Sequence, residues 1–371
     1  MSLLDRWTSI LDTLRSEGRF RSLVLPCGID FTSNDYLGKG CEPLPHGEEL
    51  PHSGRASRLL RGQHAIWDEV ETALARWHGA EATLMMTSGY TANEGLLATV
   101  IEPNDWVASD EHNHASIIDG LRLRQPHRFI YRHNDLNHLE DGLRSQMSHR
   151  SGRECFIVTE AMFGMDGDRT PLTELTELAE RYKAHLIVDE AHTTGCFGPT
   201  GSGRVDELGL RARVLATVHT GGKALGVPGA YLCGSASLKE FLVNRCRHLI
   251  FTTALAPALG AWWLAALRRV QTDESGRSAL HENAALLRAA LRQRGVEPTG
   301  SDYIVPVIVG EDAQAVRVAA RIQERGFDVR AIRPPTVPMG TARLRIAVHA
   351  NHEMRELHDL ANAIADAIRE G

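Results

Sequence analysis

Residues 185–195 read HLIVDEAHTTG, an apolar run that ends directly in acidic and histidine side chains. A short apolar run of this kind is typical of a strand buried on both faces of a parallel sheet. Several such runs are followed by glycines or helix-capping residues and then by helical segments. Strands that alternate with helices predict an α/β fold with a mostly parallel sheet, whose ligands bind at the carboxyl ends of the strands. The other runs lie at 82–86, 106–109, 154–159, 214–218 and 230–233.

The pattern changes after Pro257, where helices are expected at 261–271 and 278–294, followed by the strand and helix patterns of a compact α+β unit. A chain of 371 residues exceeds what one hydrophobic core usually holds. We therefore expect three parts, which are an N-terminal helix with an extended segment (1–45), a large α/β domain (46–265) and a smaller α+β C-terminal domain (266–371).

Composition excludes several classes of protein. The formal net charge is −6 and the pI is about 6.3, so the chain lacks the basic balance of a nucleic-acid-binding protein. Its longest uncharged apolar stretch, 254–267, is shorter than the roughly 20 residues that a membrane-spanning helix needs. The N-terminus resembles no signal peptide, and the six cysteines form no CxxC pair. We therefore expect a cytoplasmic protein with reduced thiols that binds neither nucleic acid nor a membrane.

The tetrad 189–192 spells DEAH, which is also a helicase motif. A helicase needs in addition a phosphate-binding GxxxxGK[ST] loop, and the lysine of Gly222-Lys223 is followed by alanine and lacks the upstream glycine. Histidines are frequent in the sequence, but their spacing matches no zinc motif and no cysteine accompanies them. We therefore predict neither a helicase nor a metal site. The histidines concerned are His112, His114, His133 and His138.

Only four of the 41 basic residues are lysines, at positions 39, 183, 223 and 239. Lys223 lies in TGGKALG (220–226), directly after the expected strand 214–218. Glycines beside it let the backbone approach a ligand while the amine points toward that ligand. An ordinary surface-turn lysine is the alternative, but the other three lie among helix charges or in a loop without a polar cluster. A lysine at the carboxyl end of a strand suits covalent bonding to a carbonyl cofactor.

Three further polar groups follow expected strands. Asp189 would keep a cofactor's pyridine nitrogen protonated or cap a helix, and His192 lies one turn further on, within reach of a phenolic oxygen. The segment 87–90 (TSGY) opens a helix after the strand 82–86, which offers either a phosphate site or a plain cap. His114 has a flat ring that either stacks on a cofactor or packs in the fold.

Seven segments, in this order along nearly the whole chain, together resemble the α-oxoamine synthases, a pyridoxal-phosphate (PLP) family of the aspartate-aminotransferase fold type. The resemblance implies PLP-dependent transferase fold type I, with a mostly parallel seven-stranded sheet in the large domain, and a PLP cofactor. The segments are FTSNDYLG (31–38), TSGYTAN (87–93), DEHNHASIIDG (110–120), VTEAMFGMDGD (158–168), LIVDEAHTTG (186–195), VHTGGKALGVPGA (218–230) and HLIFTTALAPA (248–258).

The resemblance implies a role for each matching residue. Lys223 resembles the lysine that bonds the cofactor and serves as the base. Asp189 resembles the partner of the pyridine nitrogen, His192 the partner of the O3′ oxygen, and His114 the histidine that stacks on the ring. Thr253 resembles a phosphate contact from the other subunit, which implies a homodimer. The remaining cofactor-binding positions are Ser88, Gly89, Tyr90, Thr220 and Glu160.

The C-terminal segments separate members of this family. AIRPPTVP (331–338) and GTARLR (340–345) resemble the members that condense L-alanine with a pimeloyl thioester in biotin biosynthesis, releasing carbon dioxide and a free thiol. The carrier is coenzyme A or acyl carrier protein. Arg345 then takes the amino-acid carboxylate. Arg21 meets the far carboxylate of the pimeloyl chain, with Arg15 and Arg19 as alternatives. Asn34 and Thr336 are further substrate-binding positions.

Two other functions stay open, namely another α-oxoamine synthase that resembles glycine C-acetyltransferase, and a PLP-fold sensor without catalysis. The presence of Lys223, Asp189, His192 and Arg345 favours an enzyme. The chain departs from the family pattern at a few positions, of which Arg55 bears on the thioester channel. Ser53 and Arg55 stand where glycines are usual, Trp67 where histidine is frequent, Gly164 where serine is usual, and Thr193 where glycine is usual.

Overall fold

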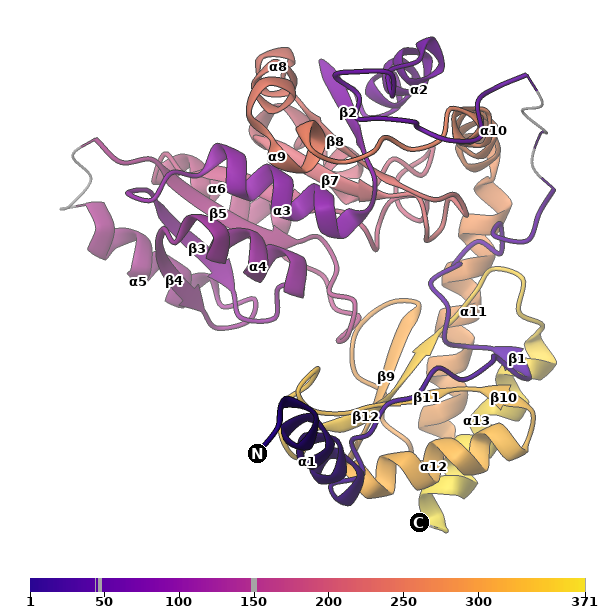
Figure 1. The fold of residues 1–371 in the computed structure, drawn as a ribbon. Coiled ribbons are helices and arrows are strands. Elements are labelled where there is room, and N and C mark those ends of the chain that lie inside the picture. Colours follow the sequence, from indigo (N-terminus) through magenta and orange to yellow (C-terminus); the bar gives the residue numbers. More distant parts are fainter. Residues whose placement is uncertain (44, 46–48, 148–151, 371) are drawn as a thin grey trace. The chain divides into compact units, whose positions relative to one another are not determined.

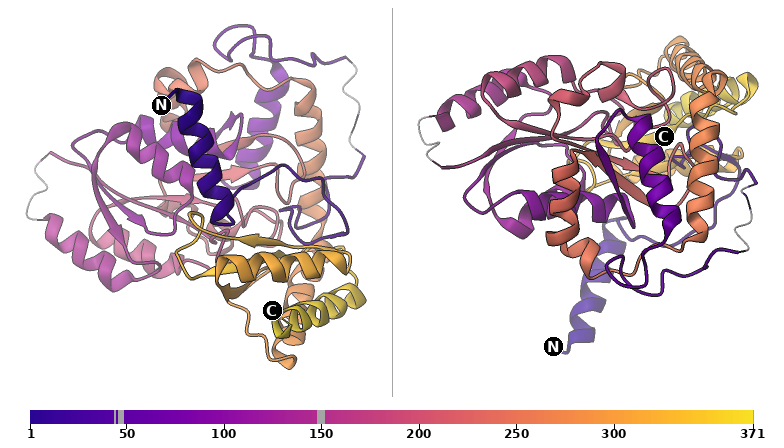
Figure 2. Two further views of the ribbon diagram at one scale, coloured as in Figure 1. Left: turned by 60° about the horizontal axis from the view of Figure 1, so that its bottom comes forward. Right: turned by 90° about the horizontal axis from the view of Figure 1, so that it is seen from above.

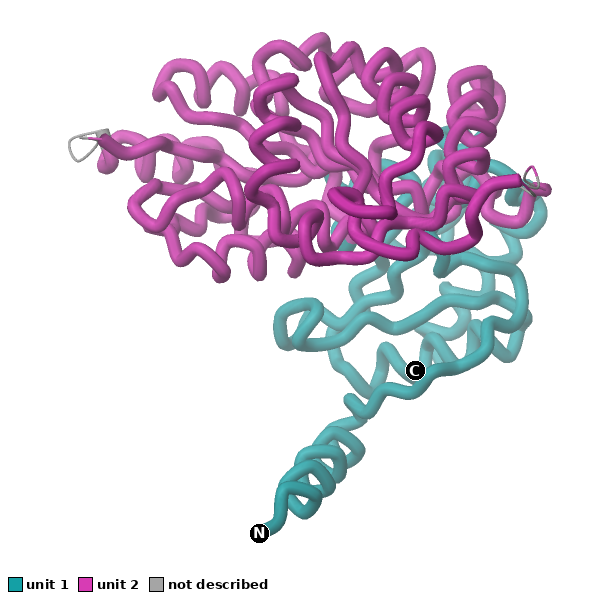
Figure 3. The backbone as a smooth tube through the Cα atoms, turned by 45° about the horizontal axis from the view of Figure 1, so that its top comes forward, with its two compact units in different colours: residues 1–34, 165–168, 279–371 teal, residues 35–164, 169–278 magenta. Residues whose placement is uncertain are grey.

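The computed structural model describes residues 1–43, 45, 49–147 and 152–370 (Figure 1, with two further views in Figure 2). The chain forms two compact units, coloured in Figure 3. The sequence-based division at 45/46 and 265/266 stays a prediction, and residue 46 lies outside the described residues. Unit 1 comprises Met1–Asn34, Met165–Asp168 and Ala279–Gly371, and unit 2 comprises Asp35–Gly164 and Arg169–Ser278.

Unit 2 contains a seven-stranded sheet in the order β2-β8-β7-β6-β5-β3-β4. Strand β8 is antiparallel to both of its neighbours and every other pair is parallel, which confirms the predicted mostly parallel α/β sheet. The strands are β2 (Ala82–Met86), β3 (Trp106–Asp110), β4 (His127–Tyr131), β5 (Cys155–Glu160), β6 (His185–Asp189), β7 (Ala216–Thr220) and β8 (Ala230–Gly234).

Helices cover both faces of this sheet, as the right-hand view of Figure 2 shows. On β6, Ile187 packs in one apolar cluster with α3 (Gly89–Val100), α4 (Ala115–Arg124) and α8 (Ala236–Arg245). The next residue, Val188, packs in the other cluster with α5 (Leu136–Met147) and α6 (Leu172–Arg181). Because successive side chains of a strand point to opposite faces, a strand covered on both sides must be apolar throughout. This explains why the apolar run of β6 is unbroken.

The remaining helices of unit 2 flank this sandwich. Helix α10 packs against α2, and α11 continues from unit 2 into unit 1. Among the described residues, no helix is long and apolar enough to cross a lipid bilayer. These elements are α2 (Ala65–Trp77), α7 (Arg204–Glu207), a 3₁₀ turn (Arg211–Arg213), α9 (Arg247–Ile250), α10 (Ala258–Thr272) and α11 (Glu274–Gln293).

Unit 1 has the α+β character expected for the C-terminal part. Its antiparallel sheet has the order β11-β12-β9, and a separate parallel pair joins β1 to β10. Helix α13 packs against α12 through an apolar face. Helix α1 buries none of its side chains. The elements are α1 (Leu3–Ser16), β1 (Ile29–Asp30), β9 (Ile304–Gly310), α12 (Asp312–Glu324), β10 (Phe327–Asp328), β11 (Arg330–Ile332), β12 (Ala342–Ala347) and α13 (Met354–Arg369).

Candidate active site

The carboxyl ends of β5, β6 and β7 bring polar side chains to one edge of the unit 2 sheet. Glu160 ends β5 and pairs in register with Asp189, which ends β6, and Thr220 ends β7 beside them. Strand β2 runs in the same direction as β7, because both are antiparallel to β8. Ser88, two residues after β2, therefore reaches the same edge. The α/β fold thus gathers the groups that the sequence analysis singled out.

Asp189 is a buried carboxylate held by two donors. The Asn93 side-chain amide donates to its Oδ2 at 2.7 Å, and the backbone N–H of Ala191 donates to its Oδ1 at 2.8 Å. Asn93 lies on α3 and also donates to the Ser116 hydroxyl oxygen at 2.9 Å. An ionised carboxylate offers about four acceptor positions, so Asp189 retains capacity for a cationic donor. Nothing local in TSGYTAN (87–93) predicts that Asn93 meets Asp189.

Lys223 belongs to a chain of three polar side chains. Its Nζ lies 3.0 Å from Nε2 of His192, and Nδ1 of that ring lies 2.6 Å from the Tyr36 hydroxyl. Tyr36 is fully buried and His192 nearly so. A Cβ at Gly164 would lie 2.4 Å from the same Nε2, so the histidine ring occupies the space that a serine there would need. Tyr36 had no predicted role, because nothing local in FTSNDYLG shows that it meets a histidine far along the chain.

His114 caps the amino terminus of α4, with its ring exposed at the same edge of the sheet. Its backbone N–H donates to Oε1 of Glu160 at 2.7 Å, and its ring lies edge-on to Tyr90 with centroids 6.0 Å apart. Removal of part of the ring from water lowers the pKa of His114, the Lys223 ammonium lowers it further, and the Asp189 carboxylate opposes both. The imidazole is therefore neutral near neutral pH.

Glu160 is buried beside a second carboxylate. Its burial raises its pKa well above the ordinary value, and the neighbouring Asp189 adds to the increase. The Lys223 ammonium and the hydrogen bond from the His114 backbone oppose this shift. Two carboxylates that share one site do not readily both ionise, which is why the pKa of Glu160 is raised.

The amino terminus of α3 offers a small cradle. Ser88 caps the helix by accepting the Thr91 N–H at 3.2 Å. A Cβ at Gly89 would lie 2.5 Å from the Thr220 methyl carbon, so only glycine fits this approach of helix to strand. The N–H groups of Gly89 and Tyr90 have no acceptor within the described residues. Free N–H groups at the positive end of a helix are suited to a phosphate. The Tyr90 hydroxyl is used elsewhere and donates to Asp119.

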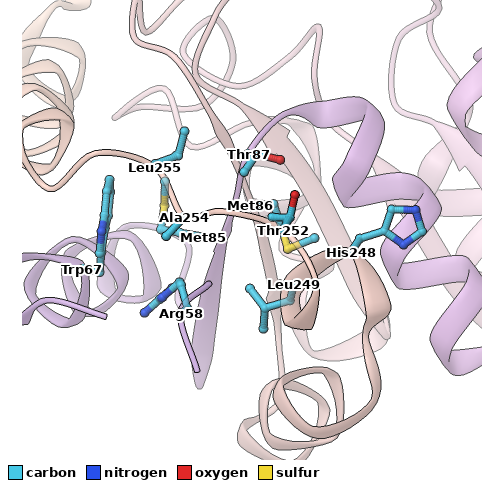
Figure 4. A pocket seen from close by; sticks show the side chains of 10 residues that line it. All are labelled: Arg58, Trp67, Met85, Met86, Thr87, His248, Leu249, Thr252, Ala254 and Leu255. Atoms are coloured by element: carbon cyan, nitrogen blue, oxygen red, sulfur yellow. The ribbon is translucent and has the colours of Figure 1, made fainter. Parts of the chain in front are cut away.

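Thr253 is exposed, and no contact joins it to the other predicted cofactor-binding residues of the described chain. Its neighbours Thr252 and Ala254 line a cavity of about 20 Å³, shown in Figure 4. The cavity is also lined by Arg58 and Trp67, and the Trp67 indole N–H has no acceptor among the described residues. A space of this size holds about one water molecule.

The predicted substrate-binding residues lie in unit 1 and form two pairs. Arg345, on β12, is buried and donates to the Asn34 side-chain oxygen at 2.8 Å. Arg21 donates to the Thr336 hydroxyl oxygen at 3.2 Å. Arg21 also lines a cavity of about 780 Å³ whose walls are mostly apolar. That lining includes Leu11, Leu14, Phe20, Val337 and Met339.

The three alternative arginines of this segment differ in their partners. Arg19 pairs with Asp312 at 3.0 Å, and Arg15 pairs with Asp12 at 2.7 Å. Arg21 has no carboxylate partner within the described part of the chain. The Arg21 guanidinium therefore retains donors that no carboxylate of the described residues occupies.

One cluster among the described residues contains three potential metal ligands, His78, His219 and Cys233, all of them buried. His78 Nε2 lies 2.8 Å from the Tyr231 hydroxyl, and both ring nitrogens of His219 lie 2.7 Å from threonine hydroxyls. Burial lowers the pKa of His78 to about 3 and raises that of Cys233 to about 12. Neutral, hydrogen-bonded rings of this kind form a polar network inside the core.

Comparison with known proteins gives consistent results. Residues 27–364 match the family model of class I and II aminotransferases. An 8-amino-7-oxononanoate synthase of Chlorobaculum parvum is 42% identical over 368 residues, covering 95% of this chain and 93% of the relative.

Two solved structures share the fold. A serine palmitoyltransferase variant from S. paucimobilis, solved with PLP and myriocin bound, superimposes with a TM-score of 0.89 at 26% identity, covering 100% of this chain and 99% of its own. An 8-amino-7-oxononanoate synthase of Francisella tularensis superimposes with a TM-score of 0.76 at 26% identity, covering 92% of this chain and 98% of its own.

Proposed function

The chain belongs to the class I and II aminotransferase family, and from this premise we propose that it is a PLP-dependent 8-amino-7-oxononanoate synthase. It condenses L-alanine with a pimeloyl thioester, and carbon dioxide and the free thiol leave. The observation that carries the proposal is the position of Lys223 at the carboxyl edge of the sheet, with its amine on His192. Of the other lysines, Lys39 and Lys239 are bound to carboxylates.

The groups at this edge fit PLP. The free N–H groups of Gly89 and Tyr90, beside Thr220, suit the phosphate. The Asp189 carboxylate, oriented by Asn93, suits a protonated pyridine nitrogen. The exposed His114 ring suits stacking on a planar cofactor. Ser88, Glu160 and His192 complete the set in unit 2.

When bound, PLP supplies an electron sink for the pair of electrons left on the alanine Cα. Within the protein, Asp189 holds the proton on the pyridine nitrogen, and the Nζ of Lys223 takes the proton from the alanine Cα and later returns one. His192 orients the amine and is itself held by Tyr36. Glu160 positions His114 by accepting a hydrogen bond from its backbone N–H.

The substrate residues of unit 1 suit the two carboxylates of the reaction. We propose that Arg345, oriented by Asn34, binds the alanine carboxylate in a bidentate manner. The cavity that contains Arg21 has mostly apolar walls, which match a hydrocarbon chain. Its second arginine, Arg19, is paired with Asp312, so Arg21 is the cation available for a carboxylate at the end of that chain. Arg21 and Thr336 would bind the distal carboxylate of the pimeloyl group.

The active form is proposed to be a homodimer in the cytoplasm. Thr253 is exposed, which leaves it accessible to the cofactor of a second subunit. All six cysteines are free thiols, and this suits a reducing compartment. Analytical ultracentrifugation of the PLP-loaded protein would test the dimer, and a monomer with full activity would exclude a shared site.

The proposal is tested by measuring release of free thiol from the PLP-loaded protein. L-Alanine and glycine are each combined with pimeloyl-CoA and acetyl-CoA. Release only with alanine and the pimeloyl donor is expected. Release with glycine and acetyl-CoA instead would identify a related α-oxoamine synthase, and binding of PLP without any turnover would identify a sensor.

A further inference from the structure

Arg55 has a backbone conformation that arginine seldom adopts. Its φ is +59°, in the left-handed region where glycine is unstrained and other residues are disfavoured. The side chain is exposed, so packing of the arginine in a core does not explain it. Unusual backbone conformations that persist in a fold are concentrated at functional sites.

The loop 53–62 is fixed against the segment that contains Thr253. A Cβ at Gly54 would lie 1.9 Å from the Ala254 carbonyl oxygen, and the Ala254 N–H donates to the Ala56 carbonyl oxygen at 2.9 Å. A Cβ at Gly62 would lie 2.2 Å from the Ala56 carbonyl oxygen. The two ends of the loop therefore meet, and the backbones of Arg55 and Arg61, each adjacent to one end, lie near each other.

The three arginines of this loop differ in what they contact. Arg58 turns inward, where its guanidinium donates to Gln63 at 2.7 Å and to the buried Glu71. Figure 4 shows it beside Ala254 at the small cavity. Arg55 and Arg61 are exposed, and neither has an acidic partner in the portion of the chain that the structure describes. The loop thus presents two uncompensated cations on a fixed support.

Apolar surface accompanies these cations. Leu59 is 51% exposed and Leu60 is 74% exposed, and both lie between Arg55 and Arg61 in the loop. A flexible arm that carries a phosphate and is partly apolar could bind both the two arginines, through its phosphate, and the two leucines, through its apolar part. Arginine suits a phosphate better than lysine does, because its planar fork donates two parallel hydrogen bonds.

We propose that Arg55 and Arg61 bind the phosphate of the pantetheine arm that carries the pimeloyl group. This inference rests on the proposed function. The loop contacts Ala254, next to Thr253, which we assign to the cofactor of the partner subunit, so the two arginines adjoin the proposed reaction site. Coenzyme A and acyl carrier protein share this phosphate, so the site serves either carrier.

The test compares Arg55→Gly and Arg61→Gln with Arg128→Gln, which removes an exposed arginine from β4. The Arg55→Gly variant is expected to fold, because glycine adopts the left-handed conformation freely. The donors are pimeloyl-CoA, pimeloyl-4′-phosphopantetheine, pimeloyl-acyl carrier protein and the pimeloyl thioester of N-acetylcysteamine, which alone has no phosphate. For either loop variant, KM is expected to rise about tenfold with the three phosphate-bearing donors, with little change in kcat. Calorimetry should show the same loss in the affinity for free CoA.

Three results would overturn the inference while leaving the proposed function intact. They are an unchanged KM with every donor, an equal rise with the N-acetylcysteamine thioester, or a rise confined to pimeloyl-acyl carrier protein, which would indicate a contact with the protein carrier. If the unsubstituted protein turns over none of these donors with alanine, the proposed function itself fails.

Discussion

The Nζ of Lys223 lies 3.0 Å from Nε2 of His192, whose Nδ1 lies 2.6 Å from the Tyr36 hydroxyl. Three segments far apart in the sequence thus converge on the only lysine at the carboxyl edge of the sheet among the described residues. This arrangement orients the amine before any substrate binds, so that positioning does not have to be achieved during the reaction.

Replacement of Lys223 by alanine is expected to abolish turnover. Loss of the base should lower kcat by at least about 10³-fold, since no other amine reaches this edge in the described structure. Thiol release measures the effect, and circular dichroism checks the fold. Lys183→Gly is the control, because it removes an exposed amine from a residue with a φ of +50°. Activity that survives in Lys223→Ala would refute the assigned base.

Tyr36 acts through His192, so Tyr36→Phe should lower kcat about tenfold without a comparable change in the KM for alanine. The pH profile of kcat should also shift, because the hydroxyl fixes which nitrogen of the ring carries the proton. Tyr131→Phe is the matched control, since it removes another buried hydroxyl, bonded to Thr159. Equal effects of both variants would indicate a structural role only.

Asn93→Ala should weaken PLP binding about tenfold to a hundredfold. The change removes the donor to Asp189 Oδ2, and the carboxylate is then less well oriented for a pyridine nitrogen. Equilibrium dialysis measures the dissociation constant. Asn244→Ala, at an exposed position on α8, should leave it unchanged. An unaltered affinity for PLP in Asn93→Ala would show that the orientation of Asp189 by Asn93 does not contribute to cofactor binding.

Gly89→Ala places a Cβ 2.5 Å from the Thr220 methyl carbon, so the affinity for PLP and the melting temperature should both fall. The double variant Gly89→Ala/Thr220→Ser should recover most of the loss, because serine keeps the hydroxyl and lacks that methyl. Thr220→Ser alone is the control, since it keeps the hydroxyl and introduces no clash. If the double variant recovers neither the affinity for PLP nor the melting temperature, a clash with the Thr220 methyl group is not the cause of the loss.

Glu190 should make stability depend on pH. Burial raises its pKa from 4.5 to about 7, while three hydrogen-bond donors oppose the increase. The folded protein therefore binds more protons than the unfolded one between these values, and the free energy of unfolding falls as pH rises from 4.5 to 7, by on the order of 3 kcal/mol.

The Glu190→Gln variant should lack this decrease and be the more stable protein above pH 7, as judged by urea denaturation. The exposed Glu174→Gln variant serves as the control. Parallel stability profiles of Glu190→Gln and the unsubstituted protein would contradict the raised pKa.

The sequence was sufficient for the central sheet, because strands covered on both faces appear as unbroken apolar runs. It missed β4, an edge strand whose side chains are mostly exposed and which therefore has no such run. Lys223 and Asp189 were predictable because one lies just after a buried strand and the other ends one, whereas Glu160 was assigned through the family resemblance. Asn93 and Tyr36 were not predictable, because their partners lie far away in sequence and only the folded chain brings them together.

The central claim is a decarboxylating condensation, and the most direct measurement follows the carboxyl carbon of alanine. The PLP-loaded protein is incubated with pimeloyl-CoA and L-alanine labelled with ¹³C at the carboxylate. The account predicts equal amounts of labelled carbon dioxide, free CoA and unlabelled 8-amino-7-oxononanoate, measured by mass spectrometry. Free CoA without labelled carbon dioxide, or a product that retains the label, would contradict it.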